Sequence, residues 1–436
     1  MKRRFFEKIT HFCKGESTTQ VLLVEGARQV GKTFGVKSAL EELDLPIVQI
    51  NFEENKIFLN KVEQTREFSE FEFLLKQDFG FDPNRPSVLF IDECQESKKI
   101  GGYVRTFHER WKNVKTILTG SSTALLFSTH RNPVGRYQRL RVTPFSFKEF
   151  LEFQSKKALV EVLDNFTLTR SEIPHLVHQT FLEEFDNYLE LGGLPGVLLA
   201  YKNGLDYRDF RLELILSQRE DFLRKTNAFE ASLFDAALSA TAQHVGSPAK
   251  YTHLDAPYRQ SKSIVSLLVE WFILRQIERH GTDPNKSEHT PKRYLYDLGV
   301  LKYFQARPLQ SIKISDAGQP SLRTYLGGVL ENAVLIELEQ FYFNKGTIST
   351  WIDGSNTRKE VDFVVDHAGK SIPIEVKATL RTTNRHFKNC LSYLETTGED
   401  LGVLVSPSPF KTLQNSSQKK LINLPIYLLS EFSKIL

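Results

Sequence analysis

Short apolar runs alternate with amphipathic stretches over the first third of the chain, between about Gln20 and Val142. The apolar runs are three to five residues long, as in strands of a buried sheet. The stretches between them repeat their apolar residues every three or four positions, as in helices. This alternation predicts an α/β domain with a doubly wound parallel sheet. The expected strands are Val21–Val24, Ile47–Asn51, Val88–Ile91, Thr116–Thr119 and Leu140–Val142.

The pattern changes after Phe150, where the strand-like runs stop and helical spacing continues to about residue 290. Within this part, Tyr251–His280 reads as a short helix, a turn and a longer amphipathic helix. Helix-turn-helix units, including winged helices that read DNA, have this spacing. A helical hairpin that only fills a core is the simpler interpretation, and the near balance of acidic and basic residues in this region favours it.

A second α/β pattern begins at about Pro291. A helix is expected around Gly327–Phe343, and a further helix is expected between the third and fourth strands that follow it. The expected strands are Ser349–Ile352, Val361–Val365, Ile372–Lys377, Leu401–Val405 and Ile426–Leu429. The three patterns predict three domains, at residues 1–145, 146–290 and 291–436.

Composition supports several domains, because 436 residues exceed what one ordinary core accommodates. The net charge of +4 does not indicate a surface dedicated to nucleic acid, although it allows a local basic face. Three distant cysteines fit a reducing compartment, and the eleven histidines form no zinc-like cluster. The N-terminus lacks the apolar stretch of a secretory signal, and no run of about eighteen apolar residues occurs. We therefore expect a cytoplasmic protein without a membrane partner.

Residues 26–33 read GARQVGKT, which has the spacing of a phosphate-binding loop. Its glycines allow backbone N–H groups to surround phosphates at the start of a helix. Lys32 is expected to reach the terminal phosphates of ATP, and the Thr33 hydroxyl to hold Mg²⁺. The expected ATP-binding residues are Gly26, Ala27, Arg28, Gln29, Val30, Gly31, Lys32 and Thr33.

The run VLFIDE supplies the second half of a nucleotide site. Its apolar part reads as a buried parallel strand that delivers Asp92 to the magnesium side of the loop. Glu93 would then orient or deprotonate the attacking water. With both segments present, the sequence predicts a nucleotide-hydrolysing domain that uses ATP and Mg²⁺.

Two further positions are candidates for contact with the phosphates. Ser121, with Thr119 as the second choice, lies at the end of the strand expected beside the Asp-Glu strand, where a polar group can sense the terminal phosphate. A plain Gly-Ser turn is the alternative. Arg136 could stabilise charge on the phosphates in cis or from a neighbouring subunit, although a surface arginine is an equally ordinary interpretation.

The last third holds a second set of charged residues. Glu331 lies on an expected helix, Asp362 on a strand, and Glu375 with Lys377 on the next strand, where residues two apart share a face. Converging carboxylates hold Mg²⁺ that activates water on a phosphodiester, so Asp362 and Glu375 are candidate metal ligands and Lys377 a candidate for orienting the water. An ion-paired strand surface is the alternative. The basic residues nearby could meet phosphates: Arg381, Arg385, His386 and Lys388.

The order of these segments over nearly the whole chain resembles a family of prokaryotic ATP-binding proteins. They join an N-terminal AAA-type ATPase domain to a C-terminal domain of unknown function that is similar to restriction-endonuclease-like nucleases. The resemblance is carried by GARQVGKT, VLFIDECQ, ILTGSS, VGRYQRLRVTPFSFKEFL, YLELGGLPGVLL, PKRYLYDLGVL, LGGVLENAVLIEL, RKEVDFVV and IPIEVKA. It implies ATP binding at the loop, a winged-helix-like middle and a nuclease-like core at Glu331, Asp362, Glu375 and Lys377. Ala27 departs from the proline expected in many relatives.

The sequence thus favours an ATPase that uses hydrolysis to reposition its C-terminal domain. Two alternatives remain: an ATP-regulated DNA endonuclease, and a non-catalytic domain that holds nucleic acid or a partner. ATP and Mg²⁺ are the expected ligands, while DNA and further copies of the chain are left open as partners.

Overall fold

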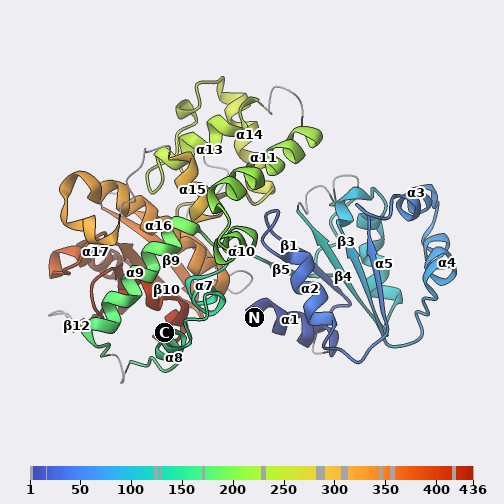
Figure 1. The fold of residues 1–436 in the computed structure, drawn as a ribbon, viewed down its shortest axis with the longest axis horizontal. Helices are drawn as coiled ribbons and strands as arrows, with labels where there is room; N and C mark the ends of the chain where they lie inside the picture. The colour runs from blue at the N-terminus through green and yellow to red at the C-terminus, as the bar shows by residue number, and fades with distance from the viewer. Residues whose placement is uncertain are drawn as a thin grey trace. The chain divides into compact units, whose positions relative to one another are not determined.

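The computed structural model describes residues 3–15, 17–121, 126–127, 130–168, 172–226, 232–280, 290–305, 313–342, 347–353, 359–414 and 419–435. The chain divides into two compact units, one made of 1–142 with 270–272 and the other of 143–269 with 273–436. Each unit has its own sheet, drawn in blue and in orange-red in Figure 1. Among the described helices, none has the length and apolarity needed to cross a membrane.

The first unit is an α/β domain around a five-stranded sheet of order β2-β3-β4-β1-β5 in which all neighbouring strands are parallel. Its strands are β1 (Val21–Glu25), β2 (Ile47–Asn51), β3 (Ser87–Asp92), β4 (Val114–Gly120) and β5 (Gln138–Arg141). Its helices are α1 (Arg4–Cys13), α2 (Lys32–Leu40), α3 (Lys56–Gln64), α4 (Phe68–Phe79) and α5 (Ile100–Arg110). The predicted parallel α/β sheet is confirmed, with the last strand beginning two residues earlier than expected.

One face of this sheet forms the main core of the first unit. Apolar residues of α3, α4 and α5 pack against alternate residues of the central strands, including Leu23, Leu89 and Ile91. Strands β1, β3 and β4 are buried along their whole length; β1 and β3 contain continuous apolar runs, whereas β4 also buries Lys115 and Thr116. Because neighbouring strands are parallel, their carboxyl ends meet at one edge of the sheet, where the polar residues lie.

The second unit begins with helices that lead to a small two-stranded ribbon. The helices are α7 (Phe147–Phe153), α8 (Lys157–Asp164), α9 (His175–Leu191), α10 (Pro195–Lys202), α11 (Tyr207–Lys225), α13 (Phe234–Gln243), α14 (Tyr258–Glu270) and α15 (Leu298–Phe304). A 3₁₀ turn, η2 (Tyr251–His253), precedes α14. The ribbon pairs β6 (Leu274–Ile277) antiparallel with β7 (Lys292–Leu295).

The long helix expected up to His280 therefore ends earlier, at Glu270. Phe272 has φ of 60°, a left-handed conformation that cannot continue a right-handed helix. Leu274–Ile277 then pairs with a strand some twenty residues away. The apolar run at 271–274 is compatible with helix and strand alike, and the long-range pairing decides between them.

The rest of the second unit is built on a six-stranded sheet of order β12-β13-β11-β10-β9-β8. Its strands are β8 (Ile348–Ile352), β9 (Glu360–His367), β10 (Lys370–Val376), β11 (Leu401–Ser406), β12 (Lys411–Gln414) and β13 (Lys420–Pro425). The pairs β10–β11 and β11–β13 are parallel and the others antiparallel. The accompanying helices are η3 (Ile314–Gly318), α16 (Pro320–Tyr342), η4 (Asn384–Phe387), α17 (Lys388–Thr397) and η5 (Ile426–Lys434).

One expectation in this region is wrong, and another extends beyond the described residues. Ile426–Leu429, expected as a strand, begins the 3₁₀ segment η5, and the strand is the preceding Lys420–Pro425. All four residues from 426 to 429 are buried, so their sequence carries no alternation from which strand could be told from helix. The helix expected to end at Phe343 is α16, and Phe343 lies outside the described residues.

Candidate nucleotide site and carboxylate cluster

The loop between β1 and α2 has the backbone conformation that a phosphate-binding loop requires. Gly26, Gln29 and Gly31 have φ of 151°, 63° and 91°, all in the region that glycine adopts most easily. A Cβ at Gly26 would come within 2.2 Å of the Val142 carbonyl oxygen, so a larger residue does not fit. The sequence motif is therefore matched by a local geometry that only glycine satisfies at position 26.

Lys32 lies inside this loop rather than in solvent. Its Nζ donates to the carbonyl oxygens of Gly26 at 2.9 Å and Ala27 at 2.8 Å. Burial lowers the pKa of Lys32 to about 8, against the opposing effects of Glu93 and Asp92. The ammonium group is thus held by neutral carbonyl groups, and a terminal phosphate would be a stronger partner.

Asp92 is the centre of a hydrogen-bond network at the carboxyl edge of the sheet. Its Oδ1 accepts from the Thr33 hydroxyl at 3.1 Å, from the Glu93 N–H at 3.1 Å and from the Thr119 hydroxyl. Its Oδ2 accepts from the Asn51 side chain at 3.3 Å. Strands β2, β3 and β4 are neighbours in that order, so each contributes a polar residue to one point.

Thr33 and Asp92 are thus in contact, as expected of residues that share a magnesium ion. Thr33 lies in the first turn of α2, and Asp92 is the last residue of β3; their contact shows that their oxygens face the same space. Hydroxyl and carboxylate oxygens are ligands that Mg²⁺ prefers. These residues fit the ion together with the phosphates of a nucleotide.

Glu93 has an unusual backbone, with φ of 52° directly after a buried strand. Its carboxylate accepts a hydrogen bond from the Gln95 side-chain amide. A Cβ at Gly120 would lie 2.5 Å from Oε1 of Gln95, so the glycine leaves room for this amide. Gln95 therefore orients the predicted water-activating carboxylate, and neither Gln95 nor Asn51 was predicted from the sequence.

The two sensor candidates differ in what they contact. Thr119, the second choice, donates to Asp92. Ser121 is buried just beyond the end of β4, and its hydroxyl makes no hydrogen bond within the described part of the chain. A buried polar group without a partner is costly, and a ligand would relieve that cost.

Arg136 is not brought to the phosphate-binding loop of its own chain. Its guanidinium contacts Glu109 at 3.2 Å, at the end of α5. Gln138, two residues later, pairs with Leu22, whereas the loop follows Glu25 at the other end of the same strand. Arg136 thus lies near the amino edge of the sheet, away from the loop at its carboxyl edge.

The four charged residues predicted in the last third do come together. Glu331 projects from α16, Asp362 from β9, and Glu375 from the end of β10, and Lys377 contacts Glu375. Asp362 Oδ2 accepts the Val376 N–H at 2.9 Å, which ties the two strands together. Residues that are 46 positions apart in the sequence thus form one cluster, as the resemblance implied.

A fifth residue, Lys292 from β7, occupies the centre of the carboxylates. Its Nζ lies 2.9 Å from Asp362, 2.7 Å from Glu360 and 3.2 Å from Glu331, and its side chain is only 4% exposed. The Tyr294 hydroxyl also donates to Glu331 at 3.1 Å. The sequence analysis did not assign a role to Lys292, although it lies in the segment PKRYLYDLGVL, because 70 residues separate it from Asp362.

Burial and the neighbouring charges shift the pKa values of the groups in this cluster strongly. Burial raises the pKa of Glu331 and of Glu375 to about 8, and the neighbouring Asp362 adds to both shifts. Burial would raise the pKa of Asp362 as well, but Lys292 and then Lys377 lower it below its usual value. Burial alone would lower the pKa of Lys292, yet the surrounding acidic groups raise it well above its usual range. Asp362 and Lys292 therefore form the charged pair at the centre.

These residues do not fit a divalent metal in this arrangement. Both Asp362 oxygens are engaged, one by Lys292 and one by the Val376 N–H. Glu375 Oε1 accepts from Asn389 at 3.2 Å, and only its Oε2 lacks a partner. No group of three or more His, Cys, Asp or Glu within the described ranges could hold a metal ion. The lysine ammonium stands where the predicted metal would be.

Comparison with known families identifies the type of domain in one part of the chain. Residues 18–151 match the family AAA_14, described as an AAA domain. Residues 182–311 and 326–427 match two families described as domains of unknown function, DUF8612 and DUF4143.

A curated relative, the uncharacterized protein MJ1544 of Methanocaldococcus jannaschii, is 22% identical over 204 residues. That match takes in 44% of this chain and 42% of the relative, so the chain spans less than half of the relative's length. Among solved structures, the Walker-type ATPase paby2304 of Pyrococcus abyssi is similar with a TM-score of 0.43 and 18% identity, over 70% of this chain and 97% of that one.

A further similar structure is PCH-2 of C. elegans, with a TM-score of 0.25 and 15% identity, over 37% of this chain and 48% of that one.

The family match, the loop geometry and the parallel sheet agree for the N-terminal region. The chain carries an AAA-type domain with a phosphate-binding loop at residues 18–151.

Proposed function

We propose that the protein binds ATP with Mg²⁺ at the N-terminal site, hydrolyses it, and uses the reaction to change the conformation of its C-terminal domain. The observation that carries the proposal is the contact of Thr33, Asn51 and Thr119 with the single carboxylate of Asp92, beside a loop that holds Lys32. Such a network supports a carboxylate that would hold Mg²⁺ beside the phosphates of a nucleotide.

Each residue has a distinct role in the proposed reaction. Lys32 exchanges its two carbonyl partners for phosphate oxygens and stabilises their negative charge. Thr33 and Asp92 hold Mg²⁺, which neutralises charge on the phosphates when bound. Glu93, oriented by Gln95, accepts a proton from the attacking water.

The test is ATP turnover by the full chain with Mg²⁺, in the wild type, Lys32→Ala and Lys37→Ala. Lys37 lies on the same helix α2, is exposed, and serves as the matched control for loss of one positive charge. We expect Lys32→Ala to reduce turnover by about a hundredfold or more, because it removes a preorganised charge at the phosphates. Equal turnover in Lys32→Ala and Lys37→Ala would refute the assignment.

Coupling to the C-terminal domain is tested separately by hydrogen exchange on β9 and β10 with and without ATP and Mg²⁺. An ATP-dependent change in protection that is absent in Lys32→Ala supports coupling. The same protection in every condition would leave an ATPase whose C-terminal domain does not respond.

A second candidate is that the C-terminal domain handles nucleic acid, favoured by the assembly of Glu331, Asp362, Glu375 and Lys377 in one place. Lys292 argues for binding rather than metal-dependent cutting, because it already neutralises the carboxylates. Cleavage of supercoiled and linear DNA with Mg²⁺ or Mn²⁺, with and without ATP, distinguishes the two. Cutting that disappears in Asp362→Ala would establish an ATP-regulated DNA endonuclease.

The division into domains at 1–145, 146–290 and 291–436, the winged-helix-like role of Tyr251–His280 and the cytoplasmic location remain predictions. So does oligomerisation, which the position of Arg136 at the amino edge of the sheet makes directly testable. If the arginine acts from a neighbouring subunit, mixing Arg136→Ala with Lys32→Ala protein restores part of the turnover that each variant lacks alone.

A further inference from the structure

A pocket of about 450 Å³ lies directly beside the carboxylate cluster, within the second unit. It is bounded by the segment after α13, the first turns of α16, the end of β10 and η4. Its volume falls within the range of about 300–1,000 Å³ that is typical of small-molecule sites. None of the residues that line it was assigned to ATP binding in the sequence analysis, because those residues belong to the first unit.

Two glycines shape the wall of this pocket. Gly246 has φ of 78°, and a Cβ there would lie 2.9 Å from the Glu331 carboxylate. A Cβ at Gly328 would come within 2.4 Å of the Val245 carbonyl oxygen. Because neither position accepts a side chain without displacement, the segment at 245–247 can lie close against α16 and leave the cavity open beside it.

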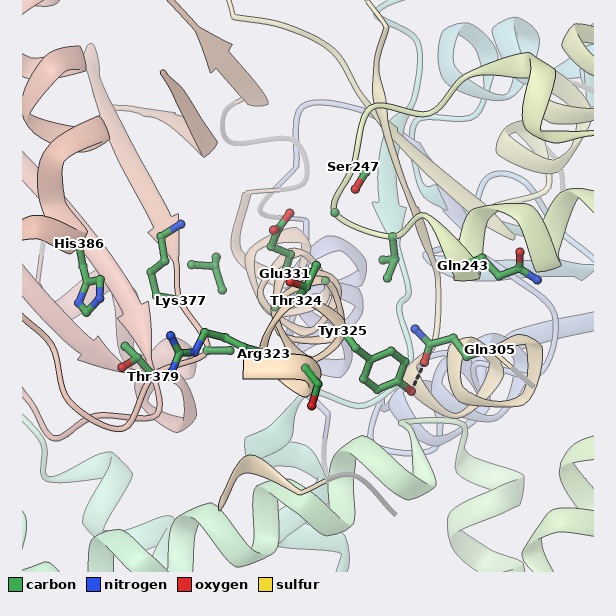
Figure 2. Close-up of a pocket in the computed structure, with 17 residues that line it drawn as sticks. Gln243, Ser247, Gln305, Arg323, Thr324, Tyr325, Glu331, Lys377, Thr379 and His386 are labelled. Atoms are coloured by element: carbon green, nitrogen blue, oxygen red, sulfur yellow. Dashed lines mark hydrogen bonds between the residues drawn. The ribbon is translucent and has the colours of Figure 1, made fainter. Parts of the chain in front are cut away.

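Basic groups gather on one side of the pocket, as Figure 2 shows for Arg323, Lys377 and His386. Burial lowers the pKa of His386, and the positive charges of Lys377 and Arg323 lower it further, so the three side chains interact electrostatically. His386 Nδ1 accepts the Thr383 N–H at 3.0 Å, so the other ring nitrogen is the one left to contact a ligand. Thr379 adds a hydroxyl on the same side.

Neutral hydrogen-bonding groups occupy the opposite side in Figure 2, from Gln243, Gln305 and Tyr325. The Tyr325 hydroxyl donates to Gln305 at 2.5 Å, so this pair is already ordered. One side of the cavity therefore suits an anion, and the other suits an uncharged polar ring system.

We propose that this pocket binds a nucleoside monophosphate, either free or at the end of a nucleic-acid strand, without a divalent metal. Arg323 and Lys377 contact the phosphate, and the amide and phenol groups contact the nucleoside. A metal is not part of the proposal because the Lys292 ammonium already contacts three carboxylates beside the pocket. This binding does not depend on ATP hydrolysis at the N-terminal site.

The test measures binding to the full chain by calorimetry in EDTA with three probes. They are a free nucleoside monophosphate, a dinucleotide with a 5′ phosphate, and the same dinucleotide without it. We expect the phosphate to be required, and we expect Arg323→Gln to weaken binding about tenfold, as loss of one charge-assisted hydrogen bond does. Binding only of the free monophosphate, or only of the dinucleotide, identifies the source of the phosphate, and both results support the site.

Arg208→Gln is the matched control, since Arg208 is exposed on α11 of the same unit and does not line the pocket. Lys32→Ala is the second control, because it disables the N-terminal loop. Equal affinities of Arg323→Gln and Arg208→Gln would overturn the proposal. So would loss of binding in Lys32→Ala, tight binding of the dinucleotide without phosphate, or a requirement for Mg²⁺.

Discussion

Replacement of Lys292 by methionine tests whether the lysine is the resident cation of the carboxylate cluster. The change keeps much of the apolar stem and removes one positive charge that lies 2.7–3.2 Å from three carboxylates. Breaking a buried ion pair by removing one partner costs about 3–5 kcal/mol, because the remaining charge is left uncompensated. Glu360 is 28% exposed, so water already supports part of its charge and the lower end of that range is expected.

The loss should depend on pH. Without Lys292, the folded pKa values of the remaining carboxyl groups rise above their unfolded values of about 4. A carboxyl group of this kind binds its proton more tightly when folded, so stability falls as pH rises from about 4 to the raised folded pKa. The free energy of unfolding of Lys292→Met should therefore be lower than that of the wild type by about 3 kcal/mol at pH 8, and by clearly less at pH 5. Asp362→Asn added to it should recover part of the loss.

The assay is hydrogen exchange of peptides from β9 and β10, since it reports this domain separately from the N-terminal unit. Lys370→Met, at an exposed position of β10, is the control for the loss of a lysine. Equal protection in Lys292→Met and Lys370→Met at pH 8 would refute the reasoning. So would Mn²⁺ binding by the wild type that Asp362→Asn abolishes, because a metal would then be the resident cation.

Three further changes have definite expected outcomes. Gly26→Ala should weaken ATP binding at least about tenfold by calorimetry, since its Cβ would clash with the Val142 carbonyl oxygen and distort the loop. Thr119→Val should lower Mg²⁺-dependent turnover about tenfold with less effect on ATP affinity, because it removes a donor to Asp92. Burial raises the pKa of Asp186 to about 6, so Asp186→Asn should raise Tm by about 2 °C at neutral pH, measured by calorimetry, and the gain should vanish near pH 4.

The N-terminal domain was largely predictable because its evidence is local. The loop glycines, Lys32 and Thr33 lie within eight residues, and the buried parallel strands are continuous apolar runs. The five strands were placed close to their observed positions, and the carboxyl-edge rule placed Asp92 beside Thr33. Asn51 ends the strand next to β3, and strand order, which the sequence does not state, was needed to recognise it.

The remaining features depend on contacts between distant segments. Lys292 joins the carboxylate cluster through β7, a strand that pairs with the distant segment Leu274–Ile277. That pairing also shortened the helix expected up to His280. A lysine on a short strand carries no local sign of burial, so its role follows only from the fold.

The two buried lysines show why similar sequence chemistry leads to different functions. Lys32 is held by two neutral carbonyl oxygens, and burial lowers its pKa to about 8, so an incoming phosphate offers a better partner than the loop does. Lys292 is held by three carboxylates that raise its pKa, so any competing cation must displace an ammonium group that is already well compensated. The first lysine is therefore available for a ligand, while the second is part of the permanent structure. This difference supports the proposals that phosphate chemistry takes place at Lys32 and that the cluster around Lys292 has a structural role beside the proposed binding pocket.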